Sequence, residues 1–300
     1  MSALDELQQA VATVAERLDA ATVAIGRDRR GSGLVIAAGQ VLTCAHNLHD
    51  RTTEVTFADG RQAQGEVLGI DADGDLVVLQ VDTAGAAPSE WAPAADATAP
   101  GQAVFGVARA ERLRVTFGLV SGTGRTFRGP RGRRIAGGIE HTAPLARGST
   151  GGPLADADGR VLGLNTLRLG DRFALAQPAD AAFQALIGRL AAGESPTRRR
   201  LGVALAPAHV ARRLRRSVGL PERDGLLVRG VEDGSPAQAA GIEVGDLLVA
   251  AAGTPLGTAD DLFAALEGAE ATLRLTVVRG SEEREVEVAF SPPAPPDAGG

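Results

Sequence analysis

Hydrophobic residues fall in short runs from residue 21 to about residue 182, and turns of glycine, aspartate and proline separate these runs. Runs of this length without helical segments between them are typical of β-barrels and not of alternating strands and helices. The pattern predicts a double β-barrel over residues 21–190. A site between two such barrels would lie at their junction.

A helical period appears just before this region. Hydrophobic residues in 3–18 recur at Leu4, Leu7, Val11, Val14 and Leu18, and Ser2 is a suitable N-cap. We therefore expect an amphipathic helix within residues 1–20 that packs on the barrels. The alternative role for this segment is an oligomerisation helix.

A second domain follows a break in the pattern. Residues 191–199 are small and polar and include a proline, as expected of a linker. Residues 200–290 then combine short strands with a helix that begins at the N-cap Thr258, and they end in a hairpin. Residues 291–300 hold several prolines and are expected to be disordered.

Composition limits the classes of function. Of the 300 residues, 44% are hydrophobic and 23% are charged, which allows two domains with real cores. The net charge of −6 argues against generic binding to nucleic acid or to anionic membranes. No stretch is long enough to span a membrane, and the first residues lack the features of a signal peptide, so a cytoplasmic location is expected by default.

The single cysteine, Cys44, excludes an internal disulfide and a cysteine metal site. We expect no metal and no cofactor. Cys44 is interpreted as a small buried hydrophobic residue, and a redox-sensitive thiol is the alternative.

Candidate chemistry lies in residues 148–153, which read GSTGGP. A hydroxyl nucleophile that attacks a carbonyl needs backbone N–H donors aimed at the developing oxyanion, and closely spaced glycines let the backbone approach that closely. Thr150 holds the nucleophile position, and the N–H groups of Gly148 and Thr150 would be the donors. Taken alone, such a segment is more often an ordinary turn.

Two further segments give the loop its weight. His46 ends an apolar strand and is a natural general base, because imidazole titrates near neutrality. Asp75 begins another apolar strand, where a buried carboxylate could orient the imidazole. The chain order of histidine, aspartate and hydroxyl residue matches chymotrypsin-type enzymes and not subtilisin or the α/β-hydrolases.

Together these features resemble the HtrA (Deg) family of trypsin-like serine proteases with a C-terminal PDZ domain. The resemblance covers nearly the whole chain and rests on residues 31–36, 41–46, 74–79, 115–121, 148–154 and 159–166. It implies a mainly β fold, a chymotrypsin-like double β-barrel followed by an α+β PDZ domain. It also places Leu145 and Leu164 in the substrate pocket, and Leu145 there implies cleavage after small or medium apolar residues.

The PDZ part of the resemblance rests on residues 200–203, 225–228, 234–242 and 245–249. It implies that Leu201, Gly202 and Val203 bind a peptide C-terminus through backbone N–H groups and strand addition. Leu262, on the helix that begins at Thr258, would line an apolar groove. Partners are therefore expected to be unfolded or C-terminally exposed polypeptides.

The resemblance has further implications. In the family, a loop at the position of residues 125–134 senses activating ligands, and a plain solvated loop is the alternative here. Trimers are common among the relatives, so a homo-oligomer is possible. Many relatives work in the cell envelope, which would apply here if the start of the chain has been trimmed.

Threonine at position 150 is the main departure from the family. Its hydroxyl is suitable, but its extra methyl restricts χ1 and takes space beside the imidazole and the oxyanion. An internal threonine also has no free amine of its own to act as base. Two hypotheses remain: an endopeptidase that uses Thr150, and a catalytically inactive protein that binds peptides as an adaptor or chaperone. Ser149 as the nucleophile is a lesser alternative.

Overall fold

A computed structural model of the chain describes residues 2–93, 98–129, 132, 134–170, 172–196 and 199–290. Contacts divide the chain into two compact units, Met1–Pro196 and Thr197–Gly300. The boundary falls inside the segment predicted as a linker. The predicted disordered tail, residues 291–300, lies outside the described residues.

The first barrel is built from six antiparallel strands. They are β1 (Thr22–Ile25), β2 (Gly31–Ala37), β3 (Gln40–Thr43), β4 (Thr52–Thr56), β5 (Gln62–Asp71) and β6 (Leu76–Gln80). The order β1-β2-β3-β6-β5-β4 closes because β1 pairs with β4. Small and aliphatic side chains such as Val23, Leu34 and Val77 fill the interior. Such residues fit because β-branched and aliphatic side chains pack well on a pleated surface.

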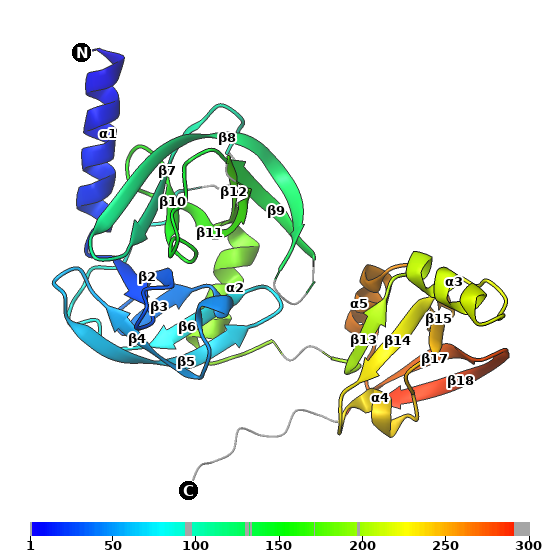
Figure 1. The fold of residues 1–300 in the computed structure, drawn as a ribbon. Helices are drawn as coiled ribbons and strands as arrows, with labels where there is room; N and C mark the ends of the chain where they lie inside the picture. Colours follow the sequence, from blue (N-terminus) through cyan, green and yellow to red (C-terminus); the bar gives the residue numbers. More distant parts are fainter. Residues whose placement is uncertain are drawn as a thin grey trace, which may run out of the picture. The chain divides into compact units, whose positions relative to one another are not determined.

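The second barrel follows the same plan. Its strands are β7 (Ala103–Arg109), β8 (Leu113–Arg128), β9 (Arg134–His141), β10 (Pro153–Ala155), β11 (Val161–Leu169) and β12 (Phe173–Pro178). They close in the order β10-β11-β12-β9-β8-β7, since β10 pairs with β7. The expected double β-barrel is confirmed (Figure 1).

Two helices flank the barrels. Helix α1 (Ala3–Leu18) starts at Ser2, whose side chain forms a capping box with Asp5, and it buries Val14 and Leu18 beside β7 and β8. Helix α2 (Ala181–Ala191) packs on β5 and β6. The approach to β5 is so close that a Cβ at Gly69 would lie 2.3 Å from the carbonyl oxygen of Leu190.

The C-terminal unit is an α+β domain, as expected. Its elements are β13 (Val203–Ala206), α3 (Ala208–Ser217), β14 (Leu226–Val231), α4 (Pro236–Ala239), β15 (Leu247–Ala251), β16 (Thr254–Pro255), α5 (Ala259–Gly268), β17 (Thr272–Arg279) and β18 (Glu282–Ala289). The main sheet runs β13-β14-β15-β17-β18, so β13 is an edge strand. Helix α5 covers the sheet through Leu262 and Leu266.

The expectation of a loop over residues 125–134 was wrong at both ends. Residues 125–128 continue strand β8 and residue 134 begins β9, so five of the seven described residues in this range lie in strands. In the C-terminal unit, Arg215 of α3 is buried and donates to the carbonyl oxygens of Pro221 and Gly280. Among the described residues, no helix combines the length and apolar character needed to cross a membrane.

Candidate active site

Three side chains predicted to act together do meet at the junction of the barrels. The ring Nδ1 of His46 lies 2.7 Å from Oδ2 of Asp75. On the other side of the ring, Nε2 lies 3.1 Å from Oγ1 of Thr150. An imidazole held between a carboxylate and a hydroxyl is the arrangement in which histidine removes a hydroxyl proton.

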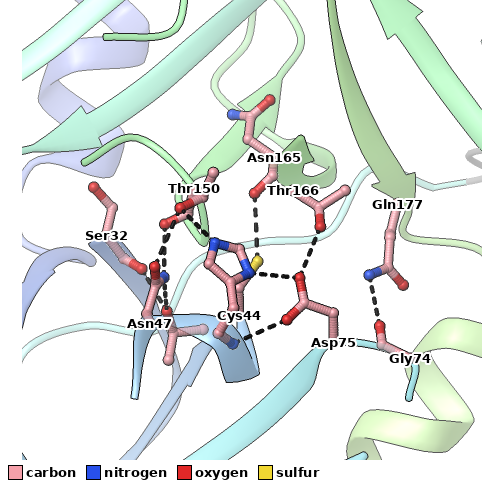
Figure 2. A network of polar contacts seen from close by, with 11 residues as sticks. Ser32, Cys44, Asn47, Gly74, Asp75, Thr150, Asn165, Thr166 and Gln177 are labelled. Atoms are coloured by element: carbon pink, nitrogen blue, oxygen red, sulfur yellow. Dashed lines mark hydrogen bonds and ion pairs between the residues drawn. The ribbon is translucent and has the colours of Figure 1, made fainter. Parts of the chain in front are cut away.

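Local backbone geometry places each member. Strand β3 ends at Thr43, and a 3-10 turn over residues 45–47 turns the chain so that His46 faces the second barrel. Asp75 precedes β6 with a positive φ of 60°, a conformation that costs free energy outside glycine. The second barrel supports this turn, because Gln177 donates from its side-chain amide to the carbonyl of Gly74 (2.9 Å, Figure 2).

The Asp75 carboxylate is buried and fully used. It accepts hydrogen bonds from the backbone N–H of His46 (3.0 Å), from the His46 ring and from the hydroxyl of Thr166 (3.1 Å). A buried charge is tolerated when donors surround it in this way. Thr166 lies on β11 of the other barrel and was not among the residues predicted from the sequence.

The nucleophile loop has the shape that its glycines allow. Gly148 and Gly151 have φ of 84° and 85°, and a Cβ at Gly151 would lie 2.2 Å from the Ser32 carbonyl oxygen. In the described part of the chain, no hydrogen bond uses the N–H of Gly148 or of Thr150. Both predicted oxyanion donors are therefore unpaired.

Ser149 does not take the place of Thr150. It is buried, its N–H donates to Ala146 and its carbonyl accepts from Gly152, so it lies in the turn and not against His46. Of the two neighbouring hydroxyl residues, the one that contacts the imidazole is Thr150.

Asn47 is a second residue of the site, after Thr166, that sequence analysis missed. Asn47 directly follows His46, is buried, and contacts Thr150 twice, since its Nδ2 donates to the Thr150 carbonyl (2.9 Å) and its Oδ1 accepts from the Thr150 hydroxyl (3.2 Å). Figure 2 shows this contact beside the imidazole. Gly31 leaves the space that the Asn47 side chain fills, because a Cβ at position 31 would lie 2.2 Å from that side chain.

The two predicted pocket residues are both buried. Leu164 is fully buried in the core with Leu42 and Cys44, so its side chain lines no open surface, because residues 161–166 of β11 are covered on both faces. Leu145 packs against Gly106 of β7. The hollow next to His46, about 560 Å³, is lined from the first barrel by Ala45, His46, Leu48, His49, Asp50, Arg51, Val67, Ile70, Ala72 and Asp75.

Cys44, His46 and Asp75 form the one group of potential metal ligands found in the described residues. The group does not fit a metal well. Burial, and secondly the charge of Asp75, raise the pKa of the Cys44 thiol well above its usual range, which disfavours the thiolate that would bind a metal. The imidazole and the carboxylate are already bonded to one another.

A second histidine, His141, supports the nucleophile loop through Asn165. His141 on β9 is buried, and its Nε2 lies 3.0 Å from Oδ1 of Asn165, whose carbonyl accepts from the N–H of Gly151. Burial lowers the pKa of His141 to about 4, so its ring is neutral at neutral pH.

The C-terminal unit brings its predicted residues together. Leu201 and Leu262 lie in one apolar cluster, and Val203 starts the edge strand β13 beside it. Gly202 has a φ of 77°. The N–H groups of Leu201 and Gly202 donate no hydrogen bond within the described residues. Their carbonyl oxygens accept from the backbone N–H groups of Ala237 and Glu232. Unpaired N–H groups next to an unpaired strand edge suit an extended peptide.

Comparison with known proteins identifies the same two domains. Residues 31–164 match the family described as trypsin-like peptidase domain, and residues 227–279 match the PDZ domain family. HhoA of Synechocystis sp., whose name calls it a serine protease, is 33% identical over 87% of this chain and 71% of its own length. A relative from Pseudomonas fluorescens, named as a DegP-like periplasmic serine endoprotease, is 30% identical, and the chain spans 55% of it.

Solved structures show the same fold. The structure described as the HtrA-type protease AlgW with decapeptide has a TM-score of 0.67 and 21% identity, over 95% of this chain and 99% of that one. A serine endoprotease from Yersinia pestis has a TM-score of 0.62 and 22% identity, over 93% and 96%.

Proposed function

Because the chain belongs to the HtrA (Deg) family of trypsin-like serine proteases with a C-terminal PDZ domain, we propose that it is an endopeptidase with Thr150 as its nucleophile. The observation that carries this proposal is the unbroken contact from the Asp75 carboxylate through the His46 ring to the Thr150 hydroxyl.

The reaction would follow from these contacts. As Oγ1 of Thr150 bonds to the carbonyl carbon, its proton passes to Nε2 of His46, and the N–H groups of Gly148 and Thr150 stabilise the oxyanion. His46 then gives that proton to the leaving amine as the C–N bond breaks. Water, deprotonated by His46, hydrolyses the acyl ester and restores the hydroxyl.

Threonine makes this step slower than serine would. Its methyl group must share the space beside the imidazole and the incoming carbonyl, and a β-branched side chain has fewer allowed χ1 values. We therefore propose slow cleavage, suited to a protein that removes damaged chains and not to one that digests them rapidly.

The proposed substrates are unfolded or C-terminally exposed polypeptides. Leu201 and Leu262 lie in one apolar cluster beside the edge strand β13, which suits a peptide that adds to this edge and ends in a hydrophobic residue. In the barrels, an apolar Leu145 is consistent with cleavage after small apolar residues. The hollow beside His46 offers room for a neighbouring substrate side chain.

A second function is favoured by one contact. The Thr150 hydroxyl also donates to Oδ1 of Asn47, an acceptor that competes with His46 for the same hydrogen. If that competition stopped turnover, the protein would bind peptides as an adaptor or chaperone.

Cleavage of unfolded casein separates the two functions. We expect slow cleavage by the unmodified chain, faster cleavage by Thr150→Ser, and none by His46→Ala. In a parallel series, a peptide ending in a hydrophobic residue is added to test whether peptide binding at β13 changes the cleavage rate. If the unmodified chain does not cut casein and only Thr150→Ser does, the result would support the peptide-binding adaptor or chaperone.

A further inference from the structure

The orientation of the Asn47 amide follows from its neighbours. Its Nδ2 lies 2.9 Å from the carbonyl oxygen of Thr150, which can only accept, and 3.0 Å from Oγ1 of Thr43. The Thr43 hydroxyl has its hydrogen on the Ser32 carbonyl, at 2.6 Å, so it accepts from Asn47. Both contacts require the NH₂ group, and the side turned to the Thr150 hydroxyl must therefore be Oδ1, an obligate acceptor.

The His46 tautomer is determined in the same way. Nδ1 faces the Asp75 carboxylate at 2.7 Å and carries a hydrogen, so in the neutral ring Nε2 is an acceptor. The Thr150 hydroxyl has one hydrogen and two acceptors, Nε2 of His46 at 3.1 Å and Oδ1 of Asn47 at 3.2 Å.

We propose that Asn47 is a competing acceptor that restrains the nucleophile of this chain. The bond to Asn47 exists only while the hydroxyl keeps its hydrogen, and it is lost as the proton moves to His46. An interaction made in the ground state and not in the transition state lowers kcat. This inference rests on the proposed endopeptidase activity and names a residue that sets its rate.

The restraint is built into the first barrel. Asn47 is 2% exposed and fits against Gly31, where a Cβ would lie 2.2 Å from its Cγ. Its amide cannot turn away without losing its bonds to Thr43 and to the Thr150 carbonyl.

The substitution Asn47→Leu removes the acceptor and leaves its partners bonded. The Thr150 carbonyl still accepts from the N–H of Ser32 at 2.9 Å, and the Thr43 hydroxyl still donates to the Ser32 carbonyl. Leucine has the same branching as asparagine, so it fits a similar volume. No buried polar group loses its last partner, and the barrel is expected to fold.

The test compares four full-length chains: unmodified, Asn47→Leu, Thr150→Ser, and the double variant. We expect Asn47→Leu to raise kcat for an unfolded casein substrate about threefold to tenfold, the rate equivalent of one neutral hydrogen bond, in either background. KM should not change, because Asn47 is buried and binds no substrate. A merely structural role would not produce this split between kcat and KM.

Thr22→Val is the matched control. Thr22 is also a buried polar residue of the first barrel, and its Oγ1 has no hydrogen-bond partner, so Thr22→Val removes a hydroxyl that is bonded neither to Thr150 nor to Asn47. We expect the same kcat as in the unmodified chain. An equal rise in both variants would attribute the effect to barrel stability and overturn the inference.

The remaining outcomes separate this inference from the proposed function. If neither chain with Thr150 cuts casein but Asn47→Leu accelerates the Thr150→Ser chain, Asn47 does restrain the nucleophile. The proposed function then fails, because Thr150 is not a working nucleophile. A fall in kcat in both backgrounds would mean that Asn47 orients the hydroxyl, which overturns the inference. If none of the four chains cuts casein, the rate at which diisopropyl fluorophosphate phosphorylates the hydroxyl of residue 150, with loss of fluoride, decides. An equal rate with and without Asn47 overturns the inference.

Discussion

Asp75 holds His46 at two points, because one carboxylate oxygen accepts from the backbone N–H and the other from the ring. The histidine is thus fixed in position and in tautomer by a single side chain. Thr166 then supplies a third donor, from the second barrel.

The substitution Asp75→Asn is expected to reduce cleavage about a thousandfold or more, because an amide can donate to Nδ1 and stabilise the wrong tautomer. Casein cleavage by the Thr150→Ser chain with and without this change measures the loss. Thr166→Val removes a donor and keeps the carboxylate, so it should cost about tenfold or less. An equal loss of cleavage in both variants would contradict the role of the Asp75 carboxylate in orienting His46.

Stability should depend on pH through His141. Its pKa is about 4 in the folded protein against about 6.5 unfolded, so as the pH falls from 6.5 the unfolded state binds the proton first. The contribution is fully present above pH 6.5 and is lost between pH 6.5 and 4, up to about 3 kcal/mol. Unfolding in urea, followed by the single Trp91, measures it.

His141→Gln is the comparison for this prediction, since glutamine can donate to Oδ1 of Asn165 and does not titrate. The difference in unfolding free energy between pH 7.5 and pH 4 should be smaller in the variant than in the unmodified chain. Parallel pH curves for the two proteins would show that His141 does not cause the loss.

The Cys44 thiol should be inert in the folded protein. It is fully buried, and burial together with the charge of Asp75 keeps its pKa far above neutrality, so little thiolate forms. Iodoacetamide at pH 8 should modify Cys44 only in urea, as mass spectrometry would detect. Rapid modification without urea would instead favour the redox-sensitive alternative.

Gly202→Ala should abolish binding of a peptide with a hydrophobic C-terminus. Position 202 has a φ of 77°, and a Cβ there would lie 2.3 Å from Cβ of Ser235, so the loop must move. Fluorescence anisotropy with a labelled peptide measures the affinity. Gly234→Ala is the control, because its φ of 70° carries the same strain but nothing lies within 4 Å.

The candidate triad could be predicted because His46 ends an apolar run, Asp75 begins one, and Thr150 lies in a glycine-rich segment, all of which are visible along the chain. His46, Asp75 and Thr150 then converge because the two barrels close and meet. Leu164 could not be placed, since β11 is buried on both faces and alternation does not show which side chains reach the surface. Arg125 lies in β8 because pairing with β9 overrides its polar, glycine-rich neighbourhood.

Asn47 shows a different limit. A polar residue after a histidine is indistinguishable from a loop residue until its surroundings are known. Its partners are Gly31, Thr43 and Thr150, which come from other strands and from the other barrel. No local period connects such positions, so only the folded structure relates them.

The close fit of Gly31 against Asn47 constrains the order in which the chain can change. With Asn47 present, any side chain at position 31 would overlap it, so position 31 is locked as glycine. A smaller residue at position 47 would have to come first before position 31 could vary. The two positions therefore form an epistatic pair. Through Asn47, which accepts from the Thr150 hydroxyl, the residue allowed at position 31 is linked to the surroundings of the nucleophile.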